Sequence, residues 1–182
     1  MIPKSDTERW MAIETQALDS LRGAGSLWRG IGSFRQVFHF LIVPSFSTVT
    51  AYSLSERRET LDGYRYYCVR AKWDRPYDTE RFKFGMRTGL ELDPTLEKAL
   101  VKLTDEFAES ILAEIANVSL PLFVQHGIQI DGTSHEFSCA HVTVTWGESV
   151  PDEWTTLAKV TMSYVECVEE LAASQPETSL ER

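Results

Sequence analysis

The sequence contains few cysteines and no long hydrophobic run. Its 182 residues include three widely spaced cysteines, Cys68, Cys139 and Cys167, and no Cys-x-x-Cys pair. This odd number and spacing argue against a disulfide framework and against a structural zinc site. The longest apolar run, at 38–44, is far shorter than the roughly 20 residues that a membrane-spanning helix needs. We therefore expect a cytoplasmic protein with reduced thiols and no membrane segment.

Basic residues are also scarce, and one half of the chain accounts for the scarcity. The whole sequence has 18 Lys+Arg against 27 Asp+Glu, a net charge of −9. Residues 1–90 contain 14 basic and 10 acidic residues, whereas residues 91–182 contain 4 basic and 17 acidic residues. Such asymmetry predicts a molecule with one acidic face. An acidic face repels nucleic acid and attracts basic protein surfaces.

The sequence lacks the common catalytic and phosphate-binding motifs. It has no Gly-x-Ser-x-Gly, Walker loop, His-Glu-x-x-His or acidic calcium loop. The glycine-rich segment "GAGSLWRGIG" at 23–32 precedes a predicted strand and not a helix, which argues against a nucleotide-binding loop. We therefore predict no catalytic residue, no metal ligand and no cofactor.

Hydrophobic periodicity predicts a single α+β domain over 1–172 and a flexible C-terminal tail over 173–182. Ser5 and Glu8 have the spacing of a capping box, which predicts an N-terminal helix. Alternating apolar residues then predict three antiparallel strands, followed by a long connection in which "RFKFGM" at 81–86 could form a short strand. The strands are expected at 34–43, 47–55 and 64–73, and the connection at 74–93.

A long central helix is predicted next, with Asp93 as its N-cap and Pro94 in its first turn. Its apolar stripe consists of Leu96, Leu100, Leu103, Phe107, Ile111 and Val118. Strands on either side of an Asp131-Gly132 turn and a final helix over 150–171 complete the pattern. We expect an antiparallel sheet of about five to six strands packed against an N-terminal helix, a long central helix and a C-terminal helix.

The segment "SHEFSCAHVTVTW" at 134–146 resembles a chemical site more than any other stretch does. As one regular strand it would place His135, Cys139 and His141 on the same face. Residues four apart in a strand lie about 13–14 Å apart, too far for His135 to share a metal with Cys139. The apolar pattern also changes parity between Cys139 and Val142, which indicates a β-bulge or tight turn there. We therefore predict that Cys139 is an inert core thiol and that no metal binds.

Two alternatives remain open. One is a small enzyme or ligand-binding domain that uses Cys139 and His141, with His39 or His126 from a neighbouring strand. The other is a nucleic-acid binder that uses the segment 57–87, where basic and aromatic residues are interleaved. The net charge of −9 and an isoelectric point near 5.0 argue against nucleic acid as a partner.

Two acidic groups on the predicted helices are candidates for binding a partner. They comprise Asp105, Glu106 and Glu109 on the solvent side of the central helix, and Glu166, Glu169 and Glu170 in the last turns of the final helix. Carboxylates near a helix C-terminus oppose the helix dipole, by roughly 0.3–1 kcal/mol each. We therefore expect these six residues to bind a basic protein.

The C-terminal unit combines "IDGTSHEF" at 130–137 with "VTVTWGESVPDEW" at 142–154. In this DGT–strand–Trp–helix layout it resembles small uncharacterised bacterial proteins, some of them encoded beside polymorphic toxins and suspected to be immunity proteins. His135 stands where these proteins commonly have an aromatic residue, and the resemblance implies no catalytic residue. Together with the acidic half, it predicts a non-enzymatic, immunity- or antitoxin-like protein that covers a basic partner such as a toxin domain. The identity of the partner and the oligomeric state stay open.

Overall fold

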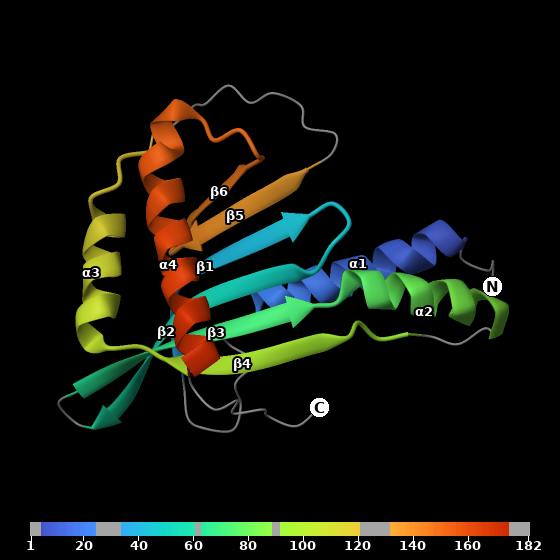
Figure 1. The fold of residues 1–182 in the computed structure, drawn as a ribbon, viewed down its shortest axis with the longest axis horizontal. Helices are drawn as coiled ribbons and strands as arrows, with labels where there is room; N and C mark the ends of the chain where they lie inside the picture. The colour runs from blue at the N-terminus through green and yellow to red at the C-terminus, as the bar shows by residue number, and fades with distance from the viewer. Residues whose placement is uncertain (1–4, 25–33, 61–62, 89–91, 121–131, 175–182) are drawn as a thin grey trace.

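The structure is a computed structural model that describes residues 5–24, 34–60, 63–88, 92–120 and 132–174. The predicted α+β fold is confirmed: an antiparallel six-stranded sheet packs between helices (Figure 1). In chain order the elements are α1 (Asp6–Arg22), β1 (Phe34–Pro44), β2 (Val49–Thr60), β3 (Gly63–Trp73), α2 (Arg75–Thr88), β4 (Leu96–Lys102), α3 (Asp105–Ala116), β5 (Thr133–Cys139), β6 (Val142–Trp146), the 3₁₀ turn η1 (Asp152–Trp154) and α4 (Thr155–Ser174).

The sheet has the strand order β4-β3-β2-β1-β5-β6. Strands β1 to β4 follow one another across it as a meander, although α2 interrupts the step from β3 to β4. Strand β5 returns from much later in the chain to pair with the free side of β1, and β6 then forms the outer edge. The two edges of the sheet are therefore β4 and β6, from the second half of the sequence.

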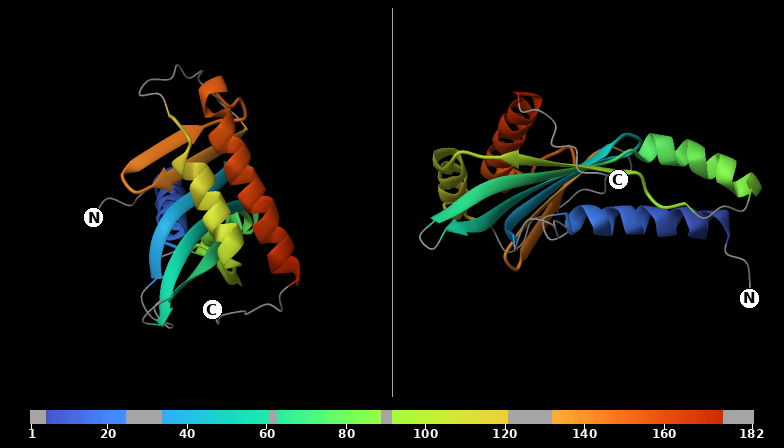
Figure 2. Two further views of the ribbon diagram at one scale, coloured as in Figure 1. Left: turned by 90° about the vertical axis from the view of Figure 1, so that its left-hand side faces the viewer. Right: turned by 90° about the horizontal axis from the view of Figure 1, so that it is seen from below.

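The sheet separates two hydrophobic cores. Helices α3 and α4 cover one face, where Phe38 and Phe40 of β1 pack with Phe137 of β5. Helix α1 covers the other face, where Leu41 of β1 packs with Trp73 of β3. Successive residues of β1 thus serve opposite cores, as the two-residue period of a strand requires. Helix α2 continues beyond the end of β3 and lies beside α1, so that both helices extend past the sheet (Figure 2).

The predicted start of the central helix is wrong. Residues 96–102 form the edge strand β4, and helix α3 begins only after Thr104, whose side chain accepts a hydrogen bond from the Phe107 N–H. Leu96 and Leu100 face the core beside α1, whereas Val101 faces the core beside α4. A spacing of four residues fits one face of a helix and one face of a strand equally well, so these two leucines were ambiguous.

The predicted connection at 74–93 contains a helix, and the short strand considered at 81–86 is wrong because these residues belong to helix α2. Helix α2 begins beside Asp74, whose carboxylate accepts a hydrogen bond from the Tyr77 N–H at 3.1 Å. Of its large apolar side chains Phe82 is buried, while Tyr77 and Phe84 are exposed. The helix therefore lacks the apolar stripe from which an amphipathic helix is recognised.

The other predicted elements agree with the structure where it describes them. The capping box of α1 is present, with the Ser5 N–H donating to Glu8 at 2.7 Å and the Glu8 N–H donating to the Ser5 hydroxyl at 3.2 Å. The final helix is confirmed, but it extends to Ser174, into the predicted tail, and the rest of that tail lies outside the described residues. The strand expected at 128–130 lies outside them too. No helix in the described part of the chain has the length and apolar character needed to cross a membrane.

Candidate protein-binding surface

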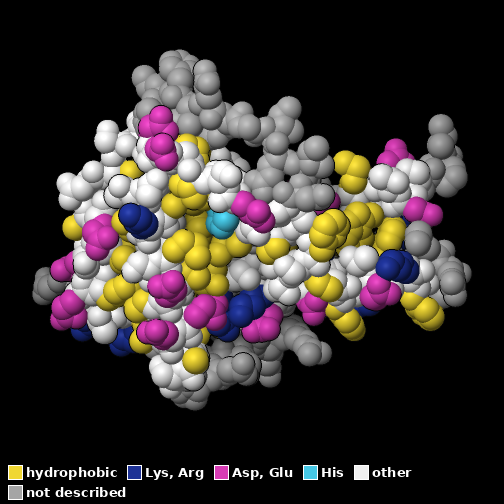
Figure 3. Space-filling model, turned by 45° about the horizontal axis from the view of Figure 1, so that its top comes forward, with side chains coloured by type: hydrophobic (Ala, Val, Ile, Leu, Met, Phe, Trp, Pro, Cys, Tyr) yellow, Lys and Arg dark blue, Asp and Glu magenta, His cyan; other side chains and the backbone are white. Residues whose placement is uncertain are grey.

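The helical layer formed by α3, η1 and α4 carries most of the net charge of the protein. Its sequences "DEFAESILAEIA", "DEW" and "TTLAKVTMSYVECVEELAAS" contain nine carboxylates and one lysine, Lys159. We call this layer the acidic layer. The excess of carboxylates over lysine in the acidic layer accounts for most of the net charge of −9 of the whole chain. Figure 3 shows acidic side chains outnumbering basic ones over this part of the molecule.

Helix periodicity determines which carboxylates of the acidic layer face solvent. Tyr164 and Val168 turn one side of α4 towards the sheet and are fully buried, so Glu166 and Glu170 fall on the exposed side. In α3 the buried Ile111 fixes the orientation in the same way, and Glu106 and Glu109 are exposed.

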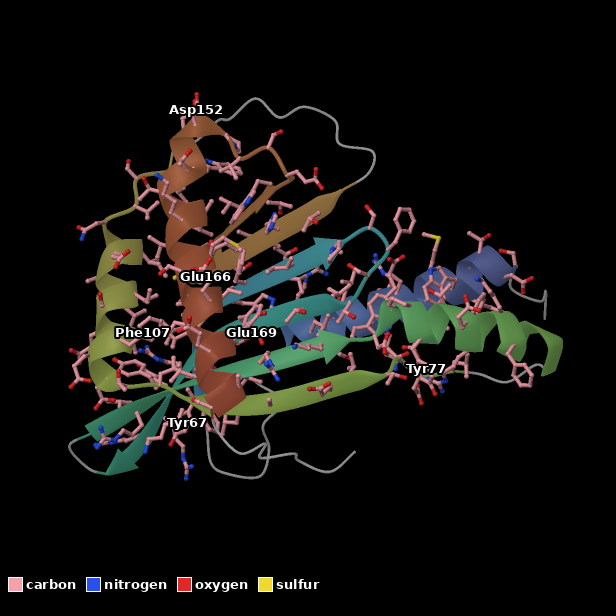
Figure 4. The ribbon with its side chains drawn as sticks, in the orientation of Figure 1. Tyr67, Tyr77, Phe107, Asp152, Glu166 and Glu169 are labelled. Carbon is pink, nitrogen blue, oxygen red and sulfur yellow. The ribbon has the colours of Figure 1, made fainter. Side chains whose placement is uncertain are left out.

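Glu169 differs from its neighbours on α4 because it faces the sheet (Figure 4). Its carboxylate accepts a hydrogen bond from the Tyr52 hydroxyl at 2.7 Å and another from Arg70 at 2.8 Å. The Lys72 ammonium lies 3.8 Å away. Burial raises the pKa of Tyr52, and the hydrogen bond to Glu169 raises it further, so the phenol stays protonated and donates. Glu169 therefore joins α4 to β2 and β3, which leaves little of it for a partner.

Asp105 is also engaged within the protein. Its carboxylate forms an ion pair with Arg65 of β3, and its side chain is half-buried. As the first residue of α3 it also lies at the positive end of the helix dipole, where a carboxylate is favourable. Of the six predicted partner-binding residues, Asp105 and Glu169 therefore have internal roles.

The other four predicted residues remain on the surface. Glu106, Glu109, Glu166 and Glu170 are exposed, and none of the cations described in the structure forms an ion pair with them. Three further carboxylates of the acidic layer, which were not among the predicted partner-binding residues, are also exposed: Glu114, Asp152 and Glu153. The pair at 152–153 could have been found from its position before the final helix, where carboxylates complement the helix dipole.

The alternative site built on Cys139 and histidines is not assembled in the described residues. Phe38 is the register partner of Cys139, which places Cys139 on the sheet face beside α4. His39 follows Phe38 and so points to the opposite face, where its Nδ1 lies 3.0 Å from the Ser53 hydroxyl. Burial lowers the pKa of His39 to about 4, and burial raises the pKa of Cys139. The sheet itself separates these two side chains.

His141 lies in a tight turn. Cys139 pairs with Val142, so Ala140 and His141 form a two-residue hairpin loop, and Ala140 has a positive φ of 52°. The predicted change of parity is confirmed, and it arises from this turn. The side chain of His141 is exposed, and His126 lies outside the described residues. The described part of the chain contains no group of three or more His, Cys, Asp or Glu side chains that could hold a metal.

His135 has a structural position in the same hairpin. Its ring stacks on Phe40 at a centroid distance of 5.9 Å and on Trp146 at 5.5 Å. Burial lowers its pKa, which favours the neutral imidazole in this aromatic stack. An imidazole ring here makes the flat contacts that an aromatic ring would make.

The basic and aromatic residues of 57–87 do not form one surface. The β2–β3 hairpin and helix α2 carry them to opposite ends of the sheet (Figure 1). Several cations are engaged internally: Arg65 with Asp105, Arg70 with Glu169, Arg75 with Glu14, Arg81 with Asp78 and Lys83 with Glu80. Tyr67 and Trp73 are buried. The arrangement therefore lacks the row of exposed aromatics beside free cations that single-stranded nucleic acid requires.

A cavity of about 560 Å³ lies between α1 and α2. Trp10, Phe46 and Phe82 line it with apolar surface, and its charged residues include Arg75 and Glu14, which pair with each other. Phe46, on the turn after β1, is 81% exposed. The charged residues that line this apolar hollow form ion pairs with one another, Arg75 with Glu14 and Lys83 with Glu80.

Comparison with protein-family models, curated proteins and solved structures gave no match to the chain.

Proposed function

We propose that this protein is a non-enzymatic binding module of the immunity or antitoxin type, which covers a basic partner such as a toxin domain with its acidic layer. The observation that carries the proposal is the segregation of charge. One helical layer on one face of the sheet has nine carboxylates and a single lysine. The proposed contact set is Glu106, Glu109, Glu166 and Glu170.

The position of the carboxylates on α4 supports a binding role over simple solvation. Glu170 lies near the C-terminal end of α4, whose final turn contains no basic residue, and Glu166 lies about one turn before Glu170. Carboxylates near this end oppose the helix dipole, whereas a lysine would be favourable and would serve solubility equally well. The ion pairs of Asp105 with Arg65 and of Glu169 with Arg70 meanwhile join both helices to the sheet. A basic partner would therefore meet a surface whose shape is already formed.

The acidic layer is expected to act first on the rate of association. Exposed charges attract an oppositely charged protein over about a Debye length, which is roughly 8 Å at physiological salt. This attraction accelerates association by about 10–10³-fold and weakens as salt rises. A binding module of this kind needs no catalytic group, because it acts by covering the surface of its partner.

The test uses the product of the adjacent gene as the candidate partner. Its association rate is measured with wild-type protein and with the Glu166→Lys/Glu170→Lys variant, at about 0.02 M and about 0.3 M salt. We expect the variant to associate about tenfold more slowly at low salt and the difference to shrink at high salt.

The matched control has the same change in net charge at a distant place. Asp19→Lys/Glu80→Lys alters exposed residues of α1 and α2; among the described residues Asp19 pairs with Arg22 and Glu80 with Lys83, exposed basic neighbours on the same helices. This control should associate nearly as fast as wild type. If both variants associate equally slowly, the slowing reflects the net charge of the protein and not the acidic layer. If the wild type does not bind the adjacent-gene product, the proposed function is refuted.

A further inference from the structure

The two edges of the sheet are built differently. Edge strand β4, "LEKALVK", contains three charged residues, Glu97, Lys98 and Lys102. Charged side chains on an edge strand discourage pairing with another chain. Edge strand β6, "VTVTW", contains none, and its valines and threonines favour extended structure. Within the described residues β6 pairs with β5 alone.

The register identifies the backbone groups that β6 presents outwards. Cys139 and Val142 flank a two-residue loop, and such a pair exchanges both hydrogen bonds within the hairpin. Because bonded and non-bonded pairs alternate along an antiparallel ladder, the N–H and C=O groups of Thr143 and Thr145 point away from β5. Both threonine side chains are exposed. The edge therefore offers two donors and two acceptors at the spacing of a β-strand.

The charge around this edge indicates which strand fits it. The turn η1 packs on β6 through Trp154, whose ring lies 6.3 Å from that of Trp146. Asp152 and Glu153 of the same turn are exposed, and Figure 4 shows Asp152 at the end where η1 leads into α4. A second copy would bring the same carboxylates towards each other. A strand with lysine or arginine side chains would instead meet opposite charges.

We propose that β6 is the docking edge for an extended, cationic strand of the partner protein, which the sheet receives as a seventh strand. This inference rests on the proposed function, since it names the part of the basic partner that makes backbone contact. Backbone hydrogen bonds from Thr143 and Thr145 would hold the strand, while Asp152 and Glu153 would select its basic side chains. Such edge pairing is a general mode of peptide recognition.

The direct test uses a synthetic eight-residue peptide of alternating lysine and valine, with the full-length protein. Amide hydrogen exchange of Thr143 and Thr145 is followed by NMR as the peptide is added. We expect both amides to exchange about tenfold more slowly in the presence of the peptide. A peptide with glutamate in place of lysine should bind about tenfold more weakly.

Two changes remove the backbone bonds without altering any charge. Thr145→Pro deletes an outward N–H group and leaves the ladder to β5 intact, as edge strands allow; Thr145→Val retains the N–H group and is the matched control. We expect the proline variant to lose peptide binding and the valine variant to keep it. If the proline variant unfolds, a lysine–valine peptide that is N-methylated at every backbone amide provides the same test, because it lacks all backbone donors while the protein is unchanged.

Several outcomes would overturn the proposal. They are unchanged exchange at millimolar peptide, equal binding of the N-methylated peptide, and protection of Thr143 and Thr145 that grows with protein concentration alone, which would assign the edge to a second copy. The adjacent-gene product separates this inference from the proposed function. If that product binds Thr145→Pro as tightly as wild type but is sensitive to Glu166→Lys/Glu170→Lys, the acidic surface stands and the strand docking fails. If it does not bind the wild type, the proposed function fails.

Discussion

The hydroxyl of Tyr52 donates a 2.7 Å hydrogen bond to Glu169, a residue 117 positions further along the chain. Together with Arg70, which binds the other carboxylate oxygen at 2.8 Å, this contact fastens the C-terminal helix to the middle of the sheet. An acidic residue on a helix can thus hold that helix on the sheet while the neighbouring acidic residues face solvent. The distinction can be measured with single substitutions.

Reversing the charge of Glu169 should destabilise the fold, whereas reversing that of Glu166 should not. Glu169→Lys places a cation beside Arg70 and Lys72 and removes the acceptor for Tyr52, so we expect a loss of about 1–3 kcal/mol in the free energy of unfolding. Glu166→Lys should change it by less than about 0.5 kcal/mol. Urea denaturation followed by circular dichroism measures both. Equal stability of the two variants would contradict the structural role of Glu169.

Asp78 should be essential for the junction between β3, α2 and β4. Its buried carboxylate accepts hydrogen bonds from the Trp73 ring N–H at 2.8 Å, the Thr95 N–H at 2.6 Å and Arg81 at 2.8 Å. Asp78→Ala leaves these donors without their acceptor, and we expect a loss of about 3–5 kcal/mol. Thermal unfolding monitored by circular dichroism tests this. An unchanged melting temperature would be evidence against this role of the carboxylate.

His39 should make the protein less stable in mild acid. Burial lowers the pKa of His39 to about 4 in the folded protein, against an ordinary value near 6.5. Between these values the unfolded chain binds the proton more readily, so stability increases with pH from about 4 to about 6.5 and is lost as pH falls through the same window. The full difference amounts to roughly 3 kcal/mol.

The measurement for His39 is the free energy of unfolding as a function of pH. His39→Gln cannot take up the proton and should flatten this profile between pH 4 and pH 6.5. His135→Phe is a useful comparison, because burial also lowers the pKa of His135 but less of its ring is enclosed. A profile that keeps its full slope in His39→Gln would assign the pH dependence to other groups.

Cys139 should be unreactive and the purified protein should contain no metal. Burial raises the pKa of Cys139, so little thiolate exists at neutral pH. We expect slow labelling of Cys139 by a thiol reagent in the native state, normal folding and partner binding of Cys139→Ser, and no stoichiometric zinc or iron by elemental analysis. Rapid labelling, or a folded serine variant without function, would reopen a catalytic interpretation.

Local patterns predicted the parts of the fold in which one physical rule dominates. The Ser5–Glu8 capping box, the alternation along β1 to β3 and the stripe of α4 depend on neighbouring residues and could be recognised from the sequence. The structure of residues 74–104 could not be predicted from such local patterns. Leu96 and Leu100 satisfy helical and strand periods together, and α2 buries too little apolar surface to show a pattern.

For the candidate site, too, some features could be predicted from the sequence and others could not. The sequence showed that the second half is acidic, and the exposed side of α4 followed from its helical period. It could not show that Glu169 would meet Tyr52 and Arg70, because that contact depends on where α4 crosses the sheet. Nor could it show that β6 would be an edge, since strand order is a long-range property.

The placement of β5 beside β1 has a consequence for synthesis in the cell. Strand β1 ends at Pro44, yet β5, which pairs with the side of β1 that β2 leaves open, begins only at Thr133. At about 5–20 residues per second, a ribosome needs on the order of ten seconds to make the intervening chain. During this interval one side of an apolar strand has no native neighbour, and the nascent chain has to avoid pairing with other chains. A version truncated before residue 133 would keep β1 in that condition permanently, and we expect it to aggregate where the complete chain folds.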